Sequence, residues 1–251
     1  MRTPGPPRLA IFRDERAAAR ALTDRIAGAL AANPSLVLGL PTGRTPVAFY
    51  HELASRVERG TVDLSRATTF NLDEFVGIPA CHPGSFRTFM NTHLFGRANL
   101  AVERIHFLNG VASDTVEECE RYERAIAAAG GIDLQILGVG SNGHIGFNEP
   151  APGLQARTHR VTLEPETRRG NAELFDGNPD AVPAEALSMG LATILQARQI
   201  VLVAMGPAKA AIVERLLRGP VTTELPGSFL QVHPDVEVVL DEAAAAGLRA
   251  S

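Results

Sequence analysis

The sequence predicts an α/β fold, doubly wound around a mostly parallel sheet in the manner of a modified Rossmann fold. Three observations lead to this prediction. Short apolar runs alternate along the chain with stretches of helical periodicity. The alternation continues without an internal repeat, a low-complexity tract or a clear linker. The 251 residues, 45% of them hydrophobic, suffice for one substantial core. We therefore expect one domain over residues 1–251.

The apolar runs predict the strands, and the periodic stretches predict the helices. Strands are expected at residues 36–40, 67–71, 105–108, 132–138, 199–204 and 236–240. Helices are expected at residues 14–32, 45–59, 85–94, 114–129, 183–195 and 207–217. Residues 150–183 break the pattern, because they are rich in Pro, Gly, Thr, Arg and Asn and only weakly periodic. We expect this segment to be a mobile lid within the domain, and an inert surface excursion is the alternative.

The first polar loop, residues 41–46, follows a predicted strand and has the sequence Pro-Thr-Gly-Arg-Thr-Pro. A turn of this kind before a helix presents backbone N–H groups to an anion, and the hydroxyls of Thr42 and Thr45 add donors. Together with Gly43 and Arg44 they form a candidate phosphate turn. The sequence matches neither the nucleotide P-loop nor the dinucleotide Gly-x-Gly-x-x-Gly pattern. An ordinary strand-to-helix turn is the structural alternative.

The second loop places two carboxylates, Asp73 and Glu74, directly after the run at 67–71. Neighbouring residues in an extended segment point to opposite sides. One carboxylate could therefore face a crevice as a general base while the other caps or solvates the loop. Helix capping or plain solvation of both is the alternative for an isolated Asp-Glu pair.

The third loop, residues 138–150, is the most informative, because four glycines, His144 and Glu149 follow the apolar run at 132–137. In a doubly wound sheet this position opens the ligand crevice. A tight connection that needs positive φ is the alternative. Lys209, the only lysine among 24 basic residues, lies at the start of the last predicted helix. A cation there is unfavourable unless an anion shares the site, which indicates a phosphate ligand.

With these loops in place, the chain resembles the glucosamine-6-phosphate deaminase family, also called glucosamine-6-phosphate isomerases. The resemblance extends from about residue 36 to residue 241. It is carried by Leu-Gly-Leu-Pro-Thr-Gly at 38–43, Phe-Asn-Leu-Asp-Glu-Phe-Val-Gly at 70–77, Gly-His-Ile-Gly-Phe-Asn-Glu-Pro at 143–150 and Ala-Leu-Ser-Met-Gly at 186–190. The combination in this order is far more specific than any single motif.

The resemblance implies an aldose-ketose isomerisation and deamination of glucosamine 6-phosphate to fructose 6-phosphate and ammonia, in amino sugar and N-acetylglucosamine catabolism. His144 would open the pyranose ring, and Asp73 would move a proton from the carbon that bears the amine to its neighbour. Glu149 would hold and tune His144, and Lys209 falls on the phosphate lysine of the family. Water would hydrolyse the resulting imine, so the enzyme would be classed as a hydrolase. No metal and no organic cofactor is implied.

The chain departs from the family pattern at three places. Asn142 stands where an aspartate often completes the relay, so His144 should depend more on Glu149. Glu173 stands where the lid usually offers a phosphate arginine, and Arg44, where glycine is common, could supply the missing charge. The allosterically regulated members carry basic and serine positions that 151–153 and 159–161 do not match. We therefore expect an unregulated enzyme, monomeric or homo-oligomeric.

Composition excludes several other classes of function. A net charge of −4 and a pI near 6.0 argue against nucleic acid or acidic membrane as the main partner. A sugar phosphate needs only a local positive pocket. Cys81 and Cys119 form neither a disulfide framework nor a metal motif, which fits a reducing cytoplasm. No apolar stretch is long enough for a membrane span, and residues 1–7 lack the pattern of a signal peptide.

Two other functions stay open at this stage. A 6-phosphogluconolactonase-like hydrolase would share the phosphate turn and a Gly-His loop, but its loop lacks the Phe-Asn-Glu-Pro continuation, and it would not need Asp73 as a carbon base. A non-catalytic sugar-phosphate sensor would have no reason to keep Asp73, His144 and Glu149 together. The identity of the sugar, and the need for its phosphate given Glu173, are not determined by the sequence.

Overall fold

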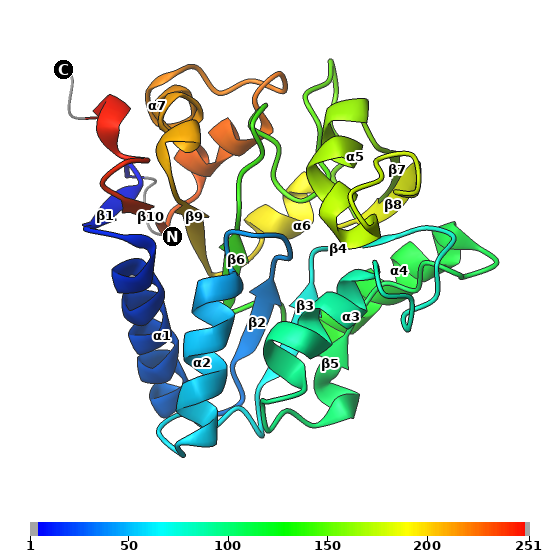
Figure 1. Ribbon diagram of the computed structural model, residues 1–251, viewed down its shortest axis with the longest axis horizontal. Coiled ribbons are helices and arrows are strands. Elements are labelled where there is room, and N and C mark those ends of the chain that lie inside the picture. The colour runs from blue at the N-terminus through cyan, green and yellow to red at the C-terminus, as the bar shows by residue number, and fades with distance from the viewer. Residues whose placement is uncertain (1–4, 249–251) are drawn as a thin grey trace.

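A seven-stranded parallel sheet forms the centre of the protein, whose computed structural model describes residues 5–248. The strand order is β1-β10-β9-β6-β2-β3-β5 (Figure 1). The strands are β1 (Arg8–Phe12), β2 (Val37–Leu40), β3 (Thr68–Asn71), β5 (Ile105–His106), β6 (Leu134–Leu137), β9 (Gln199–Ala204) and β10 (Val236–Asp241). All six predicted strands are therefore confirmed. Edge strand β1 was not predicted, because its exposed Arg8 and Leu9 give it no buried apolar run.

Helices cover both faces of this sheet, because the side chains of each strand alternate between two cores. In β2, Leu38 packs against α1 (Glu15–Ala32) and α2 (Val47–Glu58). Val37 faces the opposite core, which contains residues of α4, α6 and α7. These three helices span Thr115–Ala128, Leu191–Leu195 and Ala210–Arg218. The doubly wound architecture predicted from the sequence is thus confirmed.

The start of a helix is set by a capping side chain at two of the predicted positions. Asp14 accepts a hydrogen bond from the N–H of Ala17 at 2.8 Å, and α1 begins directly after Asp14, at Glu15. Asp114 accepts from the N–H groups of Val116 and Glu117 in the same way at the start of α4. Each cap satisfies donors that have no partner inside the helix.

The site is positioned by the point where the chain reverses its direction across the sheet. From β2 the chain adds β3 and β5 on one side, whereas β6, β9 and β10 lie on the other side of β2. Strands β2 and β6 are hydrogen-bonded neighbours, so the loops that follow them diverge and leave a crevice between them. Ligands bind at such a switch point in open α/β sheets.

A second, three-stranded antiparallel sheet stands above the carboxyl ends of the large sheet. It contains β4 (Asp73–Phe75), β8 (Glu185–Ser188) and β7 (His159–Thr162) in that order. The helix predicted at 183–195 is therefore wrong in its first half. Residues 185–188 pair with both β4 and β7, and this pairing overrides their helical propensity. Only Leu191–Leu195, helix α6, is helical.

The segment 150–183 is more regular than its composition predicted. It contains β7, the helix α5 (Pro165–Asn171) and the 3₁₀ turn η3 (Ala172–Phe175). Phe175 packs edge-to-face on Phe75 at 5.5 Å between ring centres, within an apolar cluster that also contains Phe86 and Phe147. Figure 1 shows α5, β7 and β8 gathered on the side of the molecule away from α1.

The remaining helical predictions agree with the structure apart from local changes of helix type. The stretch predicted at 85–94 divides into α3 (Phe86–Met90) and the π-helix η1 (Asn91–Phe95). The stretch predicted at 207–217 begins as the 3₁₀ turn η4 (Pro207–Lys209) before α7. Three further 3₁₀ turns are η2 (Val102–Arg104), η5 (Pro226–Val232) and η6 (Ala246–Leu248). The ends of the expected domain, residues 1–4 and 249–251, lie outside the described residues.

Candidate active site

A cleft of about 410 Å³ opens at the switch point. Loops that follow β2, β3, β6 and β9 line it, and helix α5 contributes its remaining wall. A volume of this size suits a small ligand. Eight of the nine predicted site residues line the cleft, and they are Thr42, Gly43, Arg44, Thr45, Asp73, Asn142, His144 and Lys209. The ninth, Glu149, lies directly behind His144.

The predicted phosphate turn forms one end of the cleft. Gly43 has φ +93°, a conformation that favours glycine, and α2 begins four residues later at Val47. Lys209 reaches the same end, where its Nζ donates a hydrogen bond to the carbonyl of Val139 at 2.8 Å. Burial, and secondly the charge of Arg44, lower the pKa of Lys209. A lysine whose charge is disfavoured by a neighbouring cation gains from an anion placed between the two.

Arg44 has a partner that the sequence analysis did not anticipate. Its Nη1 lies 3.7 Å from Oε1 of Glu173, and the two side chains are 80% and 71% exposed. Arg168 and Arg169 are the basic residues nearest to Glu173 in the sequence. Arg168 instead donates to the carbonyls of residues 180 and 182. The two departures from the family pattern thus pair with each other.

Asp73 is a buried carboxyl at the start of β4, only 6% exposed. Burial, and secondly the charge of Glu74, raise the pKa of Asp73 to about 8, although the hydroxyl of Thr42 opposes this shift. Within the described part of the chain, its Oδ1 has no hydrogen-bond partner. A buried polar atom without a partner at the wall of a cleft is available to a ligand.

Glu74, the neighbouring carboxylate, points the other way. Its two oxygens accept hydrogen bonds from the N–H groups of Phe75, Phe86 and Arg87 at 2.9–3.0 Å. It therefore caps the start of α3. Burial raises the pKa of Glu74, and these three backbone bonds oppose the shift. The prediction that one carboxylate faces the crevice while the other caps the loop is confirmed.

His144 and Glu149 form a hydrogen-bonded pair in the loop after β6, called here the histidine loop (residues 138–150). Nδ1 of His144 lies 3.2 Å from Oε2 of Glu149. Asn142 supports the pair, since its Nδ2 donates to the same Oε2 at 2.6 Å and its Oδ1 accepts from the N–H of His144. The imidazole packs so closely on Gly140 that a Cβ there would lie 2.3 Å from the ring. Glycine at position 140 therefore makes room for the histidine.

Glu149 and Asp73 differ sharply in charge state. Burial by itself would raise the pKa of Glu149, but the hydrogen bond and charge of His144, with Thr167 and Asn142, lower it to about 2. An ionised Glu149 fixes the orientation and tautomer of the imidazole, because an ionised carboxylate can accept a hydrogen bond but cannot donate one.

Sequence reasoning missed the contribution of helix α5. Glu166, Thr167, Gly170 and Asn171 line the cleft. Thr167 Oγ1 also donates a hydrogen bond to Oε1 of Glu149, 18 residues earlier in the chain. A proline followed by Glu-Thr could have indicated the start of a helix. No local pattern could have indicated where that helix docks.

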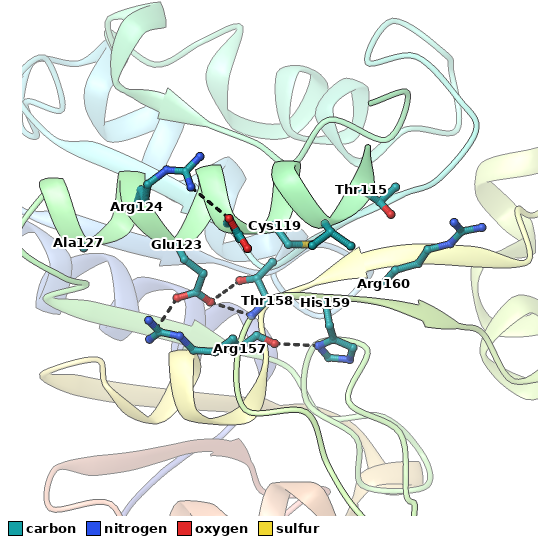
Figure 2. Close-up of a pocket in the computed structure, with 11 residues that line it drawn as sticks. Thr115, Cys119, Glu123, Arg124, Ala127, Arg157, Thr158, His159 and Arg160 are labelled. Atoms are coloured by element: carbon teal, nitrogen blue, oxygen red, sulfur yellow. Dashed lines mark hydrogen bonds and ion pairs between the residues drawn. The ribbon is translucent and has the colours of Figure 1, made fainter. Parts of the chain in front are cut away.

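A larger hollow of about 690 Å³ lies elsewhere, between α4 and residues 157–160 (Figure 2). Its charged side chains already have partners in the protein. Glu123 accepts from the N–H and hydroxyl of Thr158 and lies 3.5 Å from Arg157, while Arg124 pairs with Glu120. The cleft at the switch point differs in this respect, because the buried Oδ1 of Asp73 has no hydrogen-bond partner. The unpartnered oxygen makes the smaller cleft the candidate active site.

Three features of residues 5–248 bear on other classes of site. No group of three or more His, Cys, Asp or Glu side chains is placed there to hold a metal ion. No helix in that range is long and apolar enough to cross a membrane. Both cysteines are free, Cys81 exposed and Cys119 buried.

The fold and the cleft define a protein of the doubly wound α/β class with a small-ligand cleft at the switch point. Comparison with known proteins specifies the family. The chain belongs to the family described as glucosamine-6-phosphate isomerases/6-phosphogluconolactonase, whose model matches residues 14–239. Within it, the chain is 49% identical to the glucosamine-6-phosphate deaminase of Rhodopirellula baltica over 94% of its own length and 93% of that protein. This identity supports the family resemblance found in the sequence.

Solved structures give the same result for the fold. A monomeric glucosamine-6-phosphate deaminase superposes with a TM-score of 0.92 at 37% identity, over 96% of this chain and 99% of that one. The 6-phosphogluconolactonase of Trypanosoma cruzi superposes with a TM-score of 0.79 at 18% identity, over 98% of each chain. The second likeness shows a shared fold alone.

Proposed function

We propose that this protein converts glucosamine 6-phosphate to fructose 6-phosphate and ammonia. The observation that carries the proposal is the buried carboxyl of Asp73, whose Oδ1 has no partner, in the same cleft as His144 and a phosphate turn. The names of the relatives point to the same reaction.

His144 would open the sugar ring. Because its Nδ1 is held by Glu149, Nε2 is the nitrogen available to the substrate. It would take the proton of the anomeric hydroxyl and return a proton to the ring oxygen as the bond between that oxygen and the anomeric carbon breaks. The product is the open-chain aldehyde. General acid–base help of this kind contributes about 10²–10⁴-fold.

Asp73 would then transfer a proton between neighbouring carbons. Its carboxylate takes the proton from the carbon that bears the amine and returns it to the former aldehyde carbon. A proton of the ammonium group passes to the former aldehyde oxygen, which becomes a hydroxyl, and water hydrolyses the resulting imine to the ketone and ammonia. A carboxyl with a pKa near 8 is a stronger base, once ionised, than an ordinary aspartate. The substrate's own ammonium group would favour the ionised form on binding.

Arg44 and Lys209 would hold the phosphate, and the exposed Arg44–Glu173 pair would open to release the arginine. An exposed ion pair is worth only about 0–1 kcal/mol, whereas a charge-assisted bond to phosphate is worth about 1.5–3 kcal/mol. Arg44→Ala should therefore raise KM about tenfold. Glu173→Gln should lower KM, because it frees Arg44. An Arg44→Ala enzyme with unchanged KM would transfer this role to Arg168 or Arg169.

Residues 150–183 would act as the lid of this site. Helix α5 of the segment already forms one wall of the cleft, and η3 carries Glu173 to the phosphate end. Closure of such a wall over a bound sugar would exclude water until the proton transfers are complete.

An ammonia-release assay tests the proposal. Glucosamine 6-phosphate, galactosamine 6-phosphate, unphosphorylated glucosamine and a 6-phosphogluconolactone would be compared under the same conditions. Ammonia from glucosamine 6-phosphate, with little from the other amino sugars, is the expected result. Hydrolysis of the lactone without ammonia release would favour the 6-phosphogluconolactonase alternative, for which Asp73 has no role as a carbon base.

Several finer points belong to the same proposal. The relatives are named for deamination and isomerisation, so the hydrolase class describes only the last, water-consuming step. A role in N-acetylglucosamine catabolism, a cytoplasmic location and a monomeric state stay predictions, the last supported by the monomeric relative.

A further inference from the structure

Thr167 connects helix α5 to the carboxylate that holds His144. Its Oγ1 donates to Oε1 of Glu149, while the other oxygen, Oε2, receives Asn142 and His144. The two oxygens of Glu149 are thus divided between the lid segment and the histidine loop. Thr167 is buried, so water does not replace this bond.

The residue before Thr167 makes a second contact of the same kind. Oε1 of Glu166 accepts a hydrogen bond at 2.7 Å from the hydroxyl of Ser141, near the start of the histidine loop. The first turn of α5 therefore holds both ends of residues 141–149. Asn171 at the end of the helix donates to the carbonyl of Thr167 at 2.9 Å, which steadies the turn that carries the threonine.

The same helix faces the cleft with other residues. Gly170 and Asn171 line the cleft beside Thr167, so a sugar that fills the cleft contacts α5. One face of a short helix thus meets the ligand and the support of the catalytic histidine together. Any displacement of α5 from the histidine loop would break the bond to Glu149 and leave a buried carboxylate with one fewer donor.

We propose that Thr167 is a positioning residue, whose hydrogen bond to Glu149 makes the catalytic orientation of His144 depend on the docking of α5. The inference rests on the proposed deaminase reaction. It adds to that reaction a physical link between closure of the lid segment and ring opening. The lowered pKa of Glu149, to which Thr167 contributes after burial and His144, agrees with this link.

The test compares Thr167→Val, which removes the hydroxyl at constant shape, with Thr167→Ser, which keeps it. Thr167→Val should lower kcat about tenfold on the closed pyranose, with KM changed less than about twofold. It should have little effect on an open-chain analogue, because only ring opening needs His144. Thr167→Ser should recover kcat to within about twofold. Thr167→Ala repeats the measurement if the valine variant does not fold.

Thr23→Val is the matched control. Thr23 is also buried and donates to a carbonyl in its own helix, α1, which does not line the cleft. The Thr23→Val variant should leave kcat unchanged. Full activity of Thr167→Val, equal losses on closed and open substrates, or no rescue by serine would each overturn the inference. Absence of ammonia release from the unaltered enzyme would instead count against the proposed function.

Discussion

Two carboxyl groups beside the same cleft differ in what surrounds them. Asp73 follows β3 and is 6% exposed, and burial raises its pKa to about 8. Glu149 follows β6 and is 9% exposed, yet its pKa is about 2. Burial by itself raises the pKa of both carboxyl groups. The difference arises from donors, since Glu149 receives His144, Asn142 and Thr167, whereas Oδ1 of Asp73 has none.

The contrast shows how one cleft can hold both a proton carrier and a fixed charge. A buried carboxyl with a single hydroxyl donor and one unpartnered oxygen exchanges its proton near neutral pH, which suits a group that must take and return one. A buried carboxylate with three donors keeps its charge, which suits a group that orients an imidazole. Environments that push the pKa values of two groups apart in this way assign their roles.

The strongest test of the contrast is to remove the ionisation of Asp73. Asp73→Asn keeps the shape of the side chain but cannot accept a proton, so kcat should fall by at least ~10²-fold. Exchange of solvent deuterium at the carbon that bears the amine should disappear as well, as measured by NMR of the substrate. Exchange at the rate of the unaltered enzyme would show that another group is the base.

The dependence of kcat/KM on pH gives a second test of Asp73 as the base. A base must be deprotonated, so log kcat/KM should rise with pH through the pKa of the free enzyme, about 8 for Asp73. Thr42→Val removes the hydroxyl that lowers this pKa and should move the acid limb to higher pH. A limb that stays in place in this variant would assign it to a different group.

His144→Gln tests the partner of Glu149. The variant should lose about 10²-fold in kcat on the closed pyranose and much less on an open-chain analogue, because the proposed role of His144 is ring opening. Asn91→Gln, at an exposed position of the π-helix η1, serves as a control that should leave both rates unchanged. Equal losses on both substrates would remove ring opening from the role of His144.

Glu149→Gln should have a smaller effect, a fall in kcat of about tenfold. The amide keeps an oxygen for Thr167 or His144 but loses the charge that favours protonated imidazole. Steady-state kinetics on the closed pyranose measure this fall. A loss as large as that of Asp73→Asn would mean that Glu149 itself carries a proton, and the contrast between the two carboxyls would not hold.

The sequence predicted the loops at the strand ends that form the site, but not the segments that cover the site. Strands 36–40, 67–71 and 132–138 were recognisable as apolar runs, and parallel strands bring the residues after them to one edge. Thr42, Asp73 and His144 therefore meet as predicted. Their positions follow from local patterns and one rule of topology.

The missing parts depend on contacts between distant segments. Residues 185–188 form a strand only because β4 and β7 lie on either side of them. Thr167 acts on Glu149 through a docking contact, and Glu173 meets Arg44 across the mouth of the cleft. Sequence periodicity reports which face of an element is buried, not which loop it meets.

The smallest expected effect, and the sharpest in sign, is on stability. The pKa of Asp73 is raised in the folded state above its ordinary 3.8, so its contribution to stability is complete below pH 3.8 and is lost as pH rises through about 8. Asp73→Asn avoids this loss and should raise Tm above pH 8. The pKa of Glu149 is depressed from 4.5 to about 2, so its contribution is present above pH 4.5 and is lost as pH falls toward 2.

Glu149→Gln should therefore lower Tm at pH 8.5, where Asp73→Asn raises it, and the two variants should approach the unaltered protein at low pH. Each kcal/mol corresponds to about 2–4 °C in a chain of this size, so calorimetry at about pH 2.5 and at pH 8.5 resolves the difference. Opposite shifts at pH 8.5 follow only if one carboxyl is destabilised and the other stabilised by its surroundings. Shifts of the same sign would mean that shape, rather than ionisation, decides what each substitution does to stability, and the division of roles between Asp73 and Glu149 would lose its physical basis.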